Sequence, residues 1–197
     1  VAAASPASAA PIEMDELGIA SQMWGEPVTL IEAQTVAVEA IANAQFVIEG
    51  KILPRVREPE GPYAEVTGYY AERDDRWVIE VTAITRRRNP VFHSILSGKE
   101  VGNAYGISAA AGAFAKIHGL VPDVTAVHFA DGSVPYHLVV QIDKKHEGSQ
   151  RNAIMAAFVS LAFVKTVTVV DTDVDIYSPT DVDWAVATRC RYETDLL

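Results

Sequence analysis

The feature that most constrains the fold is a change of hydrophobic pattern on either side of one helical segment. Residues 103–119, NAYGISAAAGAFAKIHG, place Tyr105, Ala109, Phe114 and Ile117 roughly along one stripe, which predicts an α-helix. Before this helix the chain is rich in strand patterns, whereas after it strand and helix patterns alternate. A boundary near this helix therefore separates two regions of a mixed α+β protein.

The same patterns predict the elements of each region. In the first region, a short helix or turn at 14–24 precedes strands at 28–31, 45–52 and 77–85. In the second region, strands at 124–129 and 136–143 are followed by a helix at 150–163, a strand at 165–171 and a helix that begins at residues 178–180. This order predicts a small α/β domain in which helices pack on a sheet.

The charge balance limits the partners of the chain. Its 197 residues carry a formal net charge of −10 at pH 7. This acidity argues against a nucleic-acid backbone, which needs a basic face, and against anionic lipid. No apolar run approaches the ~20 residues that a membrane-spanning helix needs. We therefore expect neither a nucleic-acid partner nor a membrane partner.

The first residues of the chain and its single cysteine indicate whether the chain is processed and in which cellular compartment we expect it. Residues 1–12 are rich in Ala, Pro and Ser, which predicts a loop or linker, and they lack the basic region of a signal peptide. Because the chain begins at Val1, we interpret it as a fragment or a processed segment. Its one cysteine, Cys190, allows no internal disulfide. This fits a reducing cytoplasm, where we expect the protein.

Glu60 and Glu65 are the first candidates for acid–base chemistry. On a regular strand their spacing of five would point them to opposite faces. Gly61–Pro62 breaks the strand between them, and the residue before a proline is pushed toward extended geometry. Such a kink can bring two carboxylates into one pocket, where their pKa values separate and one stays protonated as an acid. The alternative is a pair of exposed turn glutamates.

The sequence DTDVD at 171–175 invites a calcium interpretation, which its neighbours exclude. An EF-hand loop needs Gly at its sixth position and Glu at its twelfth, but these positions hold Ile176 and Val182. We expect the carboxylates at this strand end to cap backbone groups or to pair with basic side chains. The chain also has no GK[ST] phosphate loop and no GxSxG nucleophile elbow.

Three segments, taken in order, resemble the UbiD-type decarboxylase family. FVIEGKI…EGPYAEVTGYY at 46–70 is similar to the family signature EG…EGPFGE.tGYY, and VTAITRRRNPVFHSILSGKE at 81–100 resembles the stretch that follows it. KTVTVVDTDVDIYSPTDVDWAVATRCR at 165–191 is close to the family pattern K.vivVDdDVD…DV.WA..TR. Together these segments span nearly the whole chain.

The resemblance implies a fold and a chemistry. Residues 1–94 are expected to finish a split β-barrel that binds the flavin, residues 95–119 to form a connector helix, and residues 120–197 to form a small α/β oligomerisation domain. The family decarboxylates aromatic or α,β-unsaturated carboxylic acids, reversibly and without oxidation, with prenylated FMN as the electron sink. It further implies a homo-oligomer, either a dimer or a hexamer, and a flavin prenyltransferase that supplies the cofactor.

By the same resemblance, two glutamates receive catalytic roles. Glu65 is expected to donate a proton to the carbon that loses CO2, and Glu60 is expected to be its network partner. The third member of the family's network, an arginine, would lie upstream of Val1.

The resemblance also assigns groups that hold the cofactor. Glu16, in DELGIA, resembles the glutamate that binds a divalent metal, Mn²⁺ or Mg²⁺, beside the cofactor phosphate. Lys144 resembles a lysine that approaches the flavin phosphate, and backbone near Ala4 and Ser5 is expected to help hold K⁺. The alternatives are a helix-start glutamate favoured by the macrodipole and a solvated lysine in the pair Lys144–Lys145.

Two other functions stay open at this point. One is an inactive fragment that serves as a structural and oligomerisation part. The arginine expected upstream of Val1 favours this alternative, and so do two further metal ligands of the family, an Asn and a His, which by the resemblance would also lie upstream. The other is an FMN-binding, reductase-like protein with a split barrel, against which the EGPYAE glutamates argue, because hydride transfer does not need them. The sequence selects neither the acid substrate nor the direction of the reaction.

Overall fold

The computed structural model describes residues 15–133 and 135–197. They form two compact units, one of Asp15–Gly98 and one that contains Lys99–Leu197, and each is described by itself. Among the described residues, no helix combines the length and the apolar character that crossing a bilayer requires.

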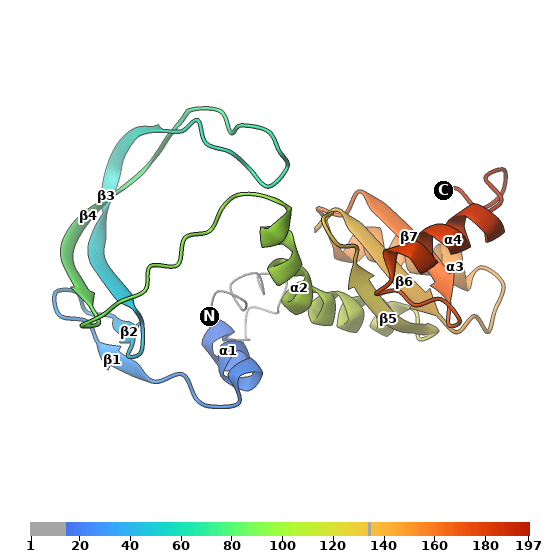
Figure 1. Cartoon of the computed structure of the whole chain (residues 1–197), viewed down its shortest axis with the longest axis horizontal. Helices are drawn as coiled ribbons and strands as arrows, with labels where there is room; N and C mark the ends of the chain where they lie inside the picture. Colours follow the sequence, from blue (N-terminus) through green and yellow to red (C-terminus); the bar gives the residue numbers. More distant parts are fainter. Residues whose placement is uncertain (1–14, 134) are drawn as a thin grey trace. The chain divides into compact units, whose positions relative to one another are not determined.

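The first unit contains one helix and two antiparallel strand pairs (Figure 1). Its elements are α1 (Glu16–Trp24), β1 (Leu30–Glu32), β2 (Glu39–Ile41), β3 (Phe46–Glu60) and β4 (Asp74–Arg86). Helix α1 begins where the side chain of Asp15 accepts hydrogen bonds from the N–H groups of Leu17 and Gly18. These bonds satisfy two N–H groups that have no partner inside the helix.

Strands β3 and β4 form a long hairpin whose register shifts twice. The shifts lie between Glu49 and Gly50 and between Ile52 and Arg57. At the first shift, a Cβ added to Gly50 would lie 2.6 Å from the backbone oxygen of Glu80. Only glycine allows the two backbones to approach so closely at this bulge.

One face of this hairpin is aliphatic and open. Ile48 lies opposite Ile84, and Ile52 lies opposite Ile79. All four side chains are more than half exposed. On the other face, the carboxylate of Glu49 is buried where it binds the turn between β1 and β2.

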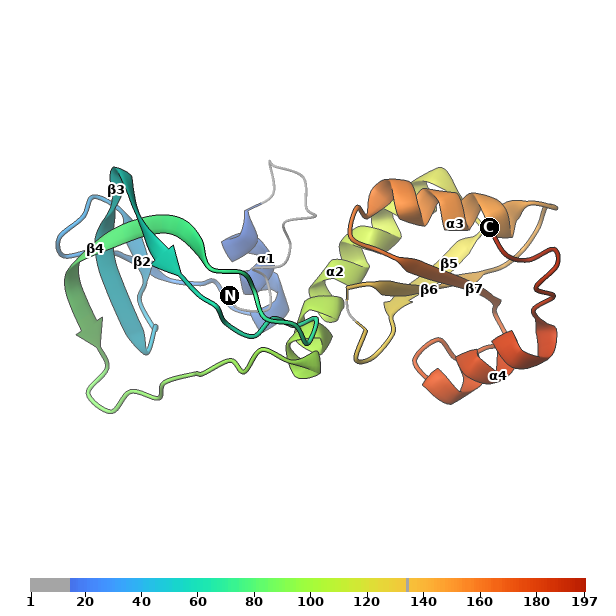
Figure 2. The same ribbon diagram turned by 90° about the horizontal axis from the view of Figure 1, so that it is seen from above.

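The second unit is a three-stranded sheet covered by helices on both faces (Figure 2). Its elements are α2 (Lys99–Leu120), β5 (Val124–Phe129), β6 (His137–Ile142), α3 (Ser149–Ser160), β7 (Thr166–Asp171) and α4 (Pro179–Arg189). The strand order is β5-β6-β7, with β5 and β6 antiparallel and β6 and β7 parallel. Helices α2 and α3 lie on one face of the sheet and α4 lies on the other.

The alternation of side chains along the strands divides the core of this unit in two. Leu138, Val140 and Ile142 of β6 are buried against α2 and α3. Val139, between them, is buried on the opposite face with α4. The sheet is therefore apolar on both faces, as expected for strands with helices on each side.

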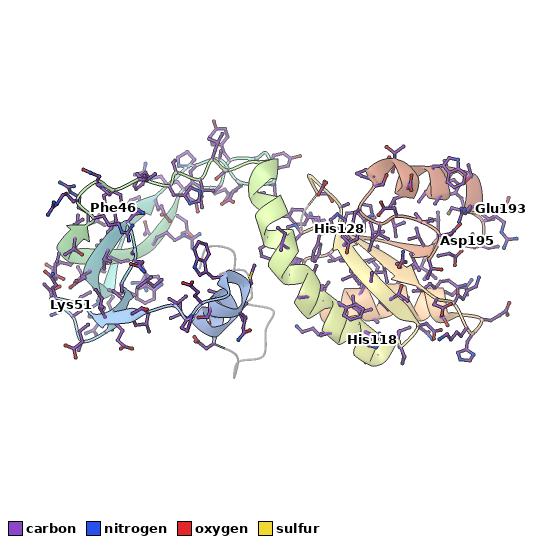
Figure 3. The ribbon with its side chains drawn as sticks, turned by 60° about the horizontal axis from the view of Figure 1, so that its bottom comes forward. Phe46, Lys51, His118, His128, Glu193 and Asp195 are labelled. Atoms are coloured by element: carbon purple, nitrogen blue, oxygen red, sulfur yellow. The ribbon has the colours of Figure 1, made fainter. Side chains whose placement is uncertain are left out.

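Local hydrogen bonds fix the ends of the helices in the second unit. His118 lies near the end of α2 (Figure 3). Its Nδ1 is 2.8 Å from the backbone oxygen of Val124, at the start of β5. At the start of α4, the hydroxyl of Ser178 accepts a hydrogen bond from the N–H of Asp181, and Pro179 occupies the first turn.

The mixed α+β class predicted from the sequence is confirmed, and so is the order strand, strand, helix, strand, helix after residue 120. The predicted helix at 103–119 is longer, at 99–120, and the predicted strand at 45–52 extends to Glu60. The short strand β2 was not predicted. The described strands form small open sheets, and none of these sheets closes into a barrel within the described part of the chain.

Candidate active site

The end of β3 and the loop that follows it carry the two glutamates that the sequence singled out. Strand β3 ends at Glu60, and Gly61 then takes a φ of 86°. A Cβ at Gly61 would lie 3.4 Å from the backbone oxygen of Glu72, so the returning chain passes close by. The predicted break of the strand at Gly61–Pro62 is therefore confirmed as a sharp turn in the backbone.

Glu60 lies at the last paired position of β3, opposite Asp74 of β4. Its side chain is exposed, and its Oε2 lies 3.9 Å from Nε of Arg76. Arg76 also approaches Asp74, with 3.2 Å between Nη1 and Oδ2. One arginine thus bridges two carboxylates at this end of the hairpin, and the sequence analysis did not find it. Arg76 lies two residues after Asp74 on β4, and only the register of β3 and β4 shows that this places it beside Glu60.

Glu65 lies five residues further, inside a tight loop. Its backbone N–H donates to the oxygen of Tyr69, and its own backbone oxygen accepts from the N–H of Gly68. The bridge between Ala64 and Tyr70 closes the same loop. These contacts fix the backbone of Glu65, whose side chain is half-buried.

The two glutamates share one loop, but they have different surroundings. Among the described residues, no hydrogen bond or ion pair joins the carboxylate of Glu60 to that of Glu65. Glu60 faces solvent beside Arg76. The convergence of Glu60 and Glu65 on one pocket stays a prediction.

Glu16 lies in the first turn of α1, where it is exposed. The neighbouring Asp15, not Glu16, caps the helix. The described residues contain no group of three or more His, Cys, Asp or Glu side chains that could hold a metal ion. Ala4 and Ser5, predicted to help hold K⁺, lie outside the described residues.

Lys144 belongs to the second unit and follows the end of β6. Its side chain is exposed and lines an open groove of about 820 Å³, which also borders β7 and the start of α3. The adjacent Lys145 pairs instead with Asp143, at 3.4 Å. Among the described residues, Lys144 takes part in no ion pair.

A buried carboxylate in the first unit was not singled out from the sequence. Glu49 is only 5% exposed. Its carboxylate accepts hydrogen bonds from the N–H of Gln34 at 2.9 Å, and from the N–H and the hydroxyl of Thr35 at 2.6 and 2.7 Å. These bonds, first that from Gln34, hold the pKa of Glu49 below its usual value. The signal in the sequence was an acidic residue within the alternating apolar pattern FVIEGKI.

The acidic sequence at 171–175 has a structural role. The guanidinium of Arg189 donates to both carboxylate oxygens of Asp173, at 2.9 and 2.8 Å. This two-point contact ties the loop after β7 to the end of α4. The expectation that these carboxylates pair with basic side chains is confirmed.

Comparison with known proteins assigns both halves of the chain. Residues 1–100 match the 3-octaprenyl-4-hydroxybenzoate carboxy-lyase Rift-related domain, and residues 104–197 match the C-terminal domain of the same carboxy-lyases. The chain belongs to the UbiD family. The resemblance inferred from the three sequence segments is therefore confirmed.

Several relatives match almost the whole chain. A protein in the cooM 5′ region of Rhodospirillum rubrum is 46% identical over all of the chain and 42% of its own length. The anhydromevalonate phosphate decarboxylase of Methanocaldococcus jannaschii is 34% identical over 96% of the chain and 45% of its own length. The chain thus spans less than half the length of these relatives.

The fold is also that of UbiD-class structures. An evolved dimeric form of HmfF from Pelotomaculum thermopropionicum, solved in complex with prFMN, superimposes with a TM-score of 0.90. It is 46% identical to the chain and covers 98% of it, while the chain covers 46% of that protein. Carboxy-lyases are therefore both the sequence relatives and the structural neighbours of this chain.

Proposed function

We propose that this protein is a reversible, non-oxidative decarboxylase of an aromatic or α,β-unsaturated carboxylic acid that uses prenylated FMN. The observation that carries the proposal is the match of both halves of the chain to UbiD-family domains, together with a 46% identical neighbour that binds prFMN. The sequence EGPYAE between β3 and β4 supplies the acidic groups that such chemistry needs. The proposal concerns the whole enzyme. This chain covers less than half the length of its relatives.

Two described side chains carry the types of group that bind a phosphate and a divalent metal, an ammonium and a carboxylate. Prenylated FMN supplies the electron sink that loss of CO2 requires. Lys144 offers an exposed ammonium group that no ion pair engages among the described residues, and we propose that it binds the phosphate. Glu16 offers an exposed carboxylate next to a helix start that Asp15 already caps. We propose that it binds Mn²⁺ or Mg²⁺, which prefer oxygen ligands.

We propose that Glu65 is the proton donor. Its backbone is fixed by hydrogen bonds on both sides of the loop, and its side chain is half-buried. A fixed acid can deliver its proton to one carbon, because its carboxyl group needs little reorganisation. Glu60, beside Arg76, is the proposed partner in the proton network.

The remaining features follow from the same assignment. We propose the domain division 1–94, 95–119 and 120–197, a homo-oligomer, a flavin prenyltransferase as the source of the cofactor, and a cytoplasmic location. A K⁺ site at Ala4 and Ser5 belongs to the same proposal.

The cofactor that the protein retains tests this function. The polypeptide that contains this chain should be produced together with a flavin prenyltransferase, and the bound small molecule should be identified by mass. We expect prenylated FMN, and we expect Lys144→Ala to reduce the bound fraction more than the matched Lys116→Ala. Bound unmodified FMN together with NADH oxidation would instead support the reductase-like alternative.

A further inference from the structure

One aspartate is hydrogen-bonded to the loop on both sides of Lys144. Asp123 lies just before β5 and the loop follows β6, and the pairing of these strands brings the two segments together. The backbone oxygen of Asp123 accepts a hydrogen bond from the N–H of Asp143 at 2.8 Å. Its Oδ2 accepts from the N–H of Lys145 at 3.5 Å and from the hydroxyl of Ser149 at 2.6 Å. The backbone is therefore held immediately before and immediately after Lys144.

The loop depends on this distant aspartate because the start of α3 offers no cap of its own. Gly148, the residue before the helix, has a φ of 88° and no side chain that could accept from the first N–H groups. Ser149 is only 5% exposed, so its hydrogen bond to Asp123 is largely shielded from water. The bonds from Ser149 and Lys145 hold the pKa of the Asp123 carboxyl below its usual value, so it accepts them as a carboxylate.

The charges of the loop leave one ammonium group without a carboxylate. Nζ of Lys145 lies 3.4 Å from Oδ2 of Asp143. Lys144, between them, is exposed and takes part in no ion pair among the described residues. Ordering a lysine side chain on a ligand costs conformational entropy. A backbone that is already held on both sides lowers this cost, because only the side chain remains to be ordered.

We propose that Asp123 is a positioning residue, which holds Lys144 in place to bind the phosphate of the flavin cofactor. This inference rests on the proposed function, in which Lys144 binds that phosphate. Asp123 acts only through the loop, because a carboxylate in contact with a phosphate would repel it. The carboxylate of Asp123 therefore contributes to cofactor binding without touching the cofactor.

Binding of FMN and of riboflavin separates a positioning role from a purely structural one. FMN carries the phosphate and riboflavin lacks it, so a residue that acts through Lys144 affects only FMN. The polypeptide that contains this chain should be prepared without flavin and titrated with each compound by fluorescence. We expect Asp123→Ala to weaken FMN binding by about tenfold, the size of one hydrogen bond to a charged group, and to leave riboflavin binding unchanged. Equal weakening for both flavins, or an unchanged or stronger FMN affinity, would overturn the proposal.

The same titration with Lys144→Ala tests whether Asp123 acts through this lysine. In the Lys144→Ala background, Asp123→Ala should cause no further loss of FMN affinity. Losses that simply add would overturn this inference and leave the phosphate role of Lys144 standing. A Lys144→Ala variant that binds FMN like the wild type would overturn both.

Two further variants control for folding and for net charge. Ser149→Ala removes one hydrogen bond and keeps the carboxylate of Asp123, so it should weaken FMN binding in the same direction even where Asp123→Ala does not fold. Asp131→Ala removes the same charge from an exposed position beyond the other end of β5, and it should bind FMN like the wild type. Wild-type affinity in Ser149→Ala, or an equal loss in Asp131→Ala, would contradict the positioning role.

Discussion

The close approach of β3 and β4 at Gly50 makes a quantitative prediction. In Gly50→Ala, the new Cβ would lie 2.6 Å from the backbone oxygen of Glu80 and 2.8 Å from Cγ2 of Ile79. Both distances are below 3.0 Å, a separation that real Cβ contacts essentially never show. Ile79 can change its side-chain conformation, whereas the backbone oxygen of Glu80 is held in the paired strand. The hairpin must therefore open locally.

Overpacking of this kind costs about 1–3 kcal/mol of unfolding free energy. For a unit of roughly 60–100 residues, each 1 kcal/mol lowers the melting temperature by about 4–8 °C. We therefore expect Gly50→Ala to lower the melting temperature of the first unit by roughly 5–20 °C. Circular dichroism recorded during heating measures the change.

Gly18→Ala is the matched control in the same unit. A Cβ at Gly18 meets its nearest neighbour, Oδ2 of Asp15, at an ordinary 3.6 Å. This variant should keep or slightly raise the melting temperature, because alanine favours a helix over glycine. If Gly50→Ala melted within 2 °C of the wild type, or if both variants lost equal stability, the close approach of the two strands would be refuted.

Three further predictions address the described contacts. Glu49→Gln should reduce the loss of stability that the first unit undergoes in acid. Because the pKa of Glu49 is lowered in the folded state, its carboxylate stabilises the unit fully above the usual glutamate pKa, and this stabilisation is lost as pH falls through the folded-state pKa. Urea unfolding at several pH values measures the effect, and an unfolding free energy that depends on pH as in the wild type would contradict it. Ile117→Ala, at a fully buried position, should cost about 2–5 kcal/mol in chemical denaturation, whereas Ile107→Ala, at an exposed position, should cost within about 0.5 kcal/mol. Asp173→Asn should weaken the contact with Arg189 and so increase the hydrogen exchange of backbone amides at the end of α4. Unchanged exchange of these amides would contradict the role of this contact.

Sequence patterns were sufficient where each element has one dominant signal. The β-branched segment Val124–Phe129 and the residues Ser178–Pro179 each predict their element from local chemistry alone, and the structure agrees. By contrast, β2 has three residues and no apolar alternation. Its pairing depends on β1, so the local pattern does not reveal it.

Some residues of the candidate site could be predicted from the local sequence, and others could not because their contacts are with distant residues. The residues of the loop after β3 are contiguous, so Glu60 and Glu65 could be proposed from one short segment. Arg76 and Glu49 could not, because their partners are brought close by strand register and by a distant turn. A sequence shows which groups are present, whereas contacts between strands decide which of them are paired.

The rate of CO2 release tests the central claim most directly. It should be measured for the prenylated-FMN-loaded polypeptide that contains this chain, with a panel of aromatic and α,β-unsaturated acids. We expect turnover that Glu65→Gln lowers by about 10²–10⁴-fold, the contribution of a general acid, with cofactor content unchanged. Glu72→Gln, at an exposed position between the same strands, should retain the wild-type rate. A loaded enzyme that releases no CO2 from any acid, or a Glu65→Gln variant as fast as wild type, would contradict the account.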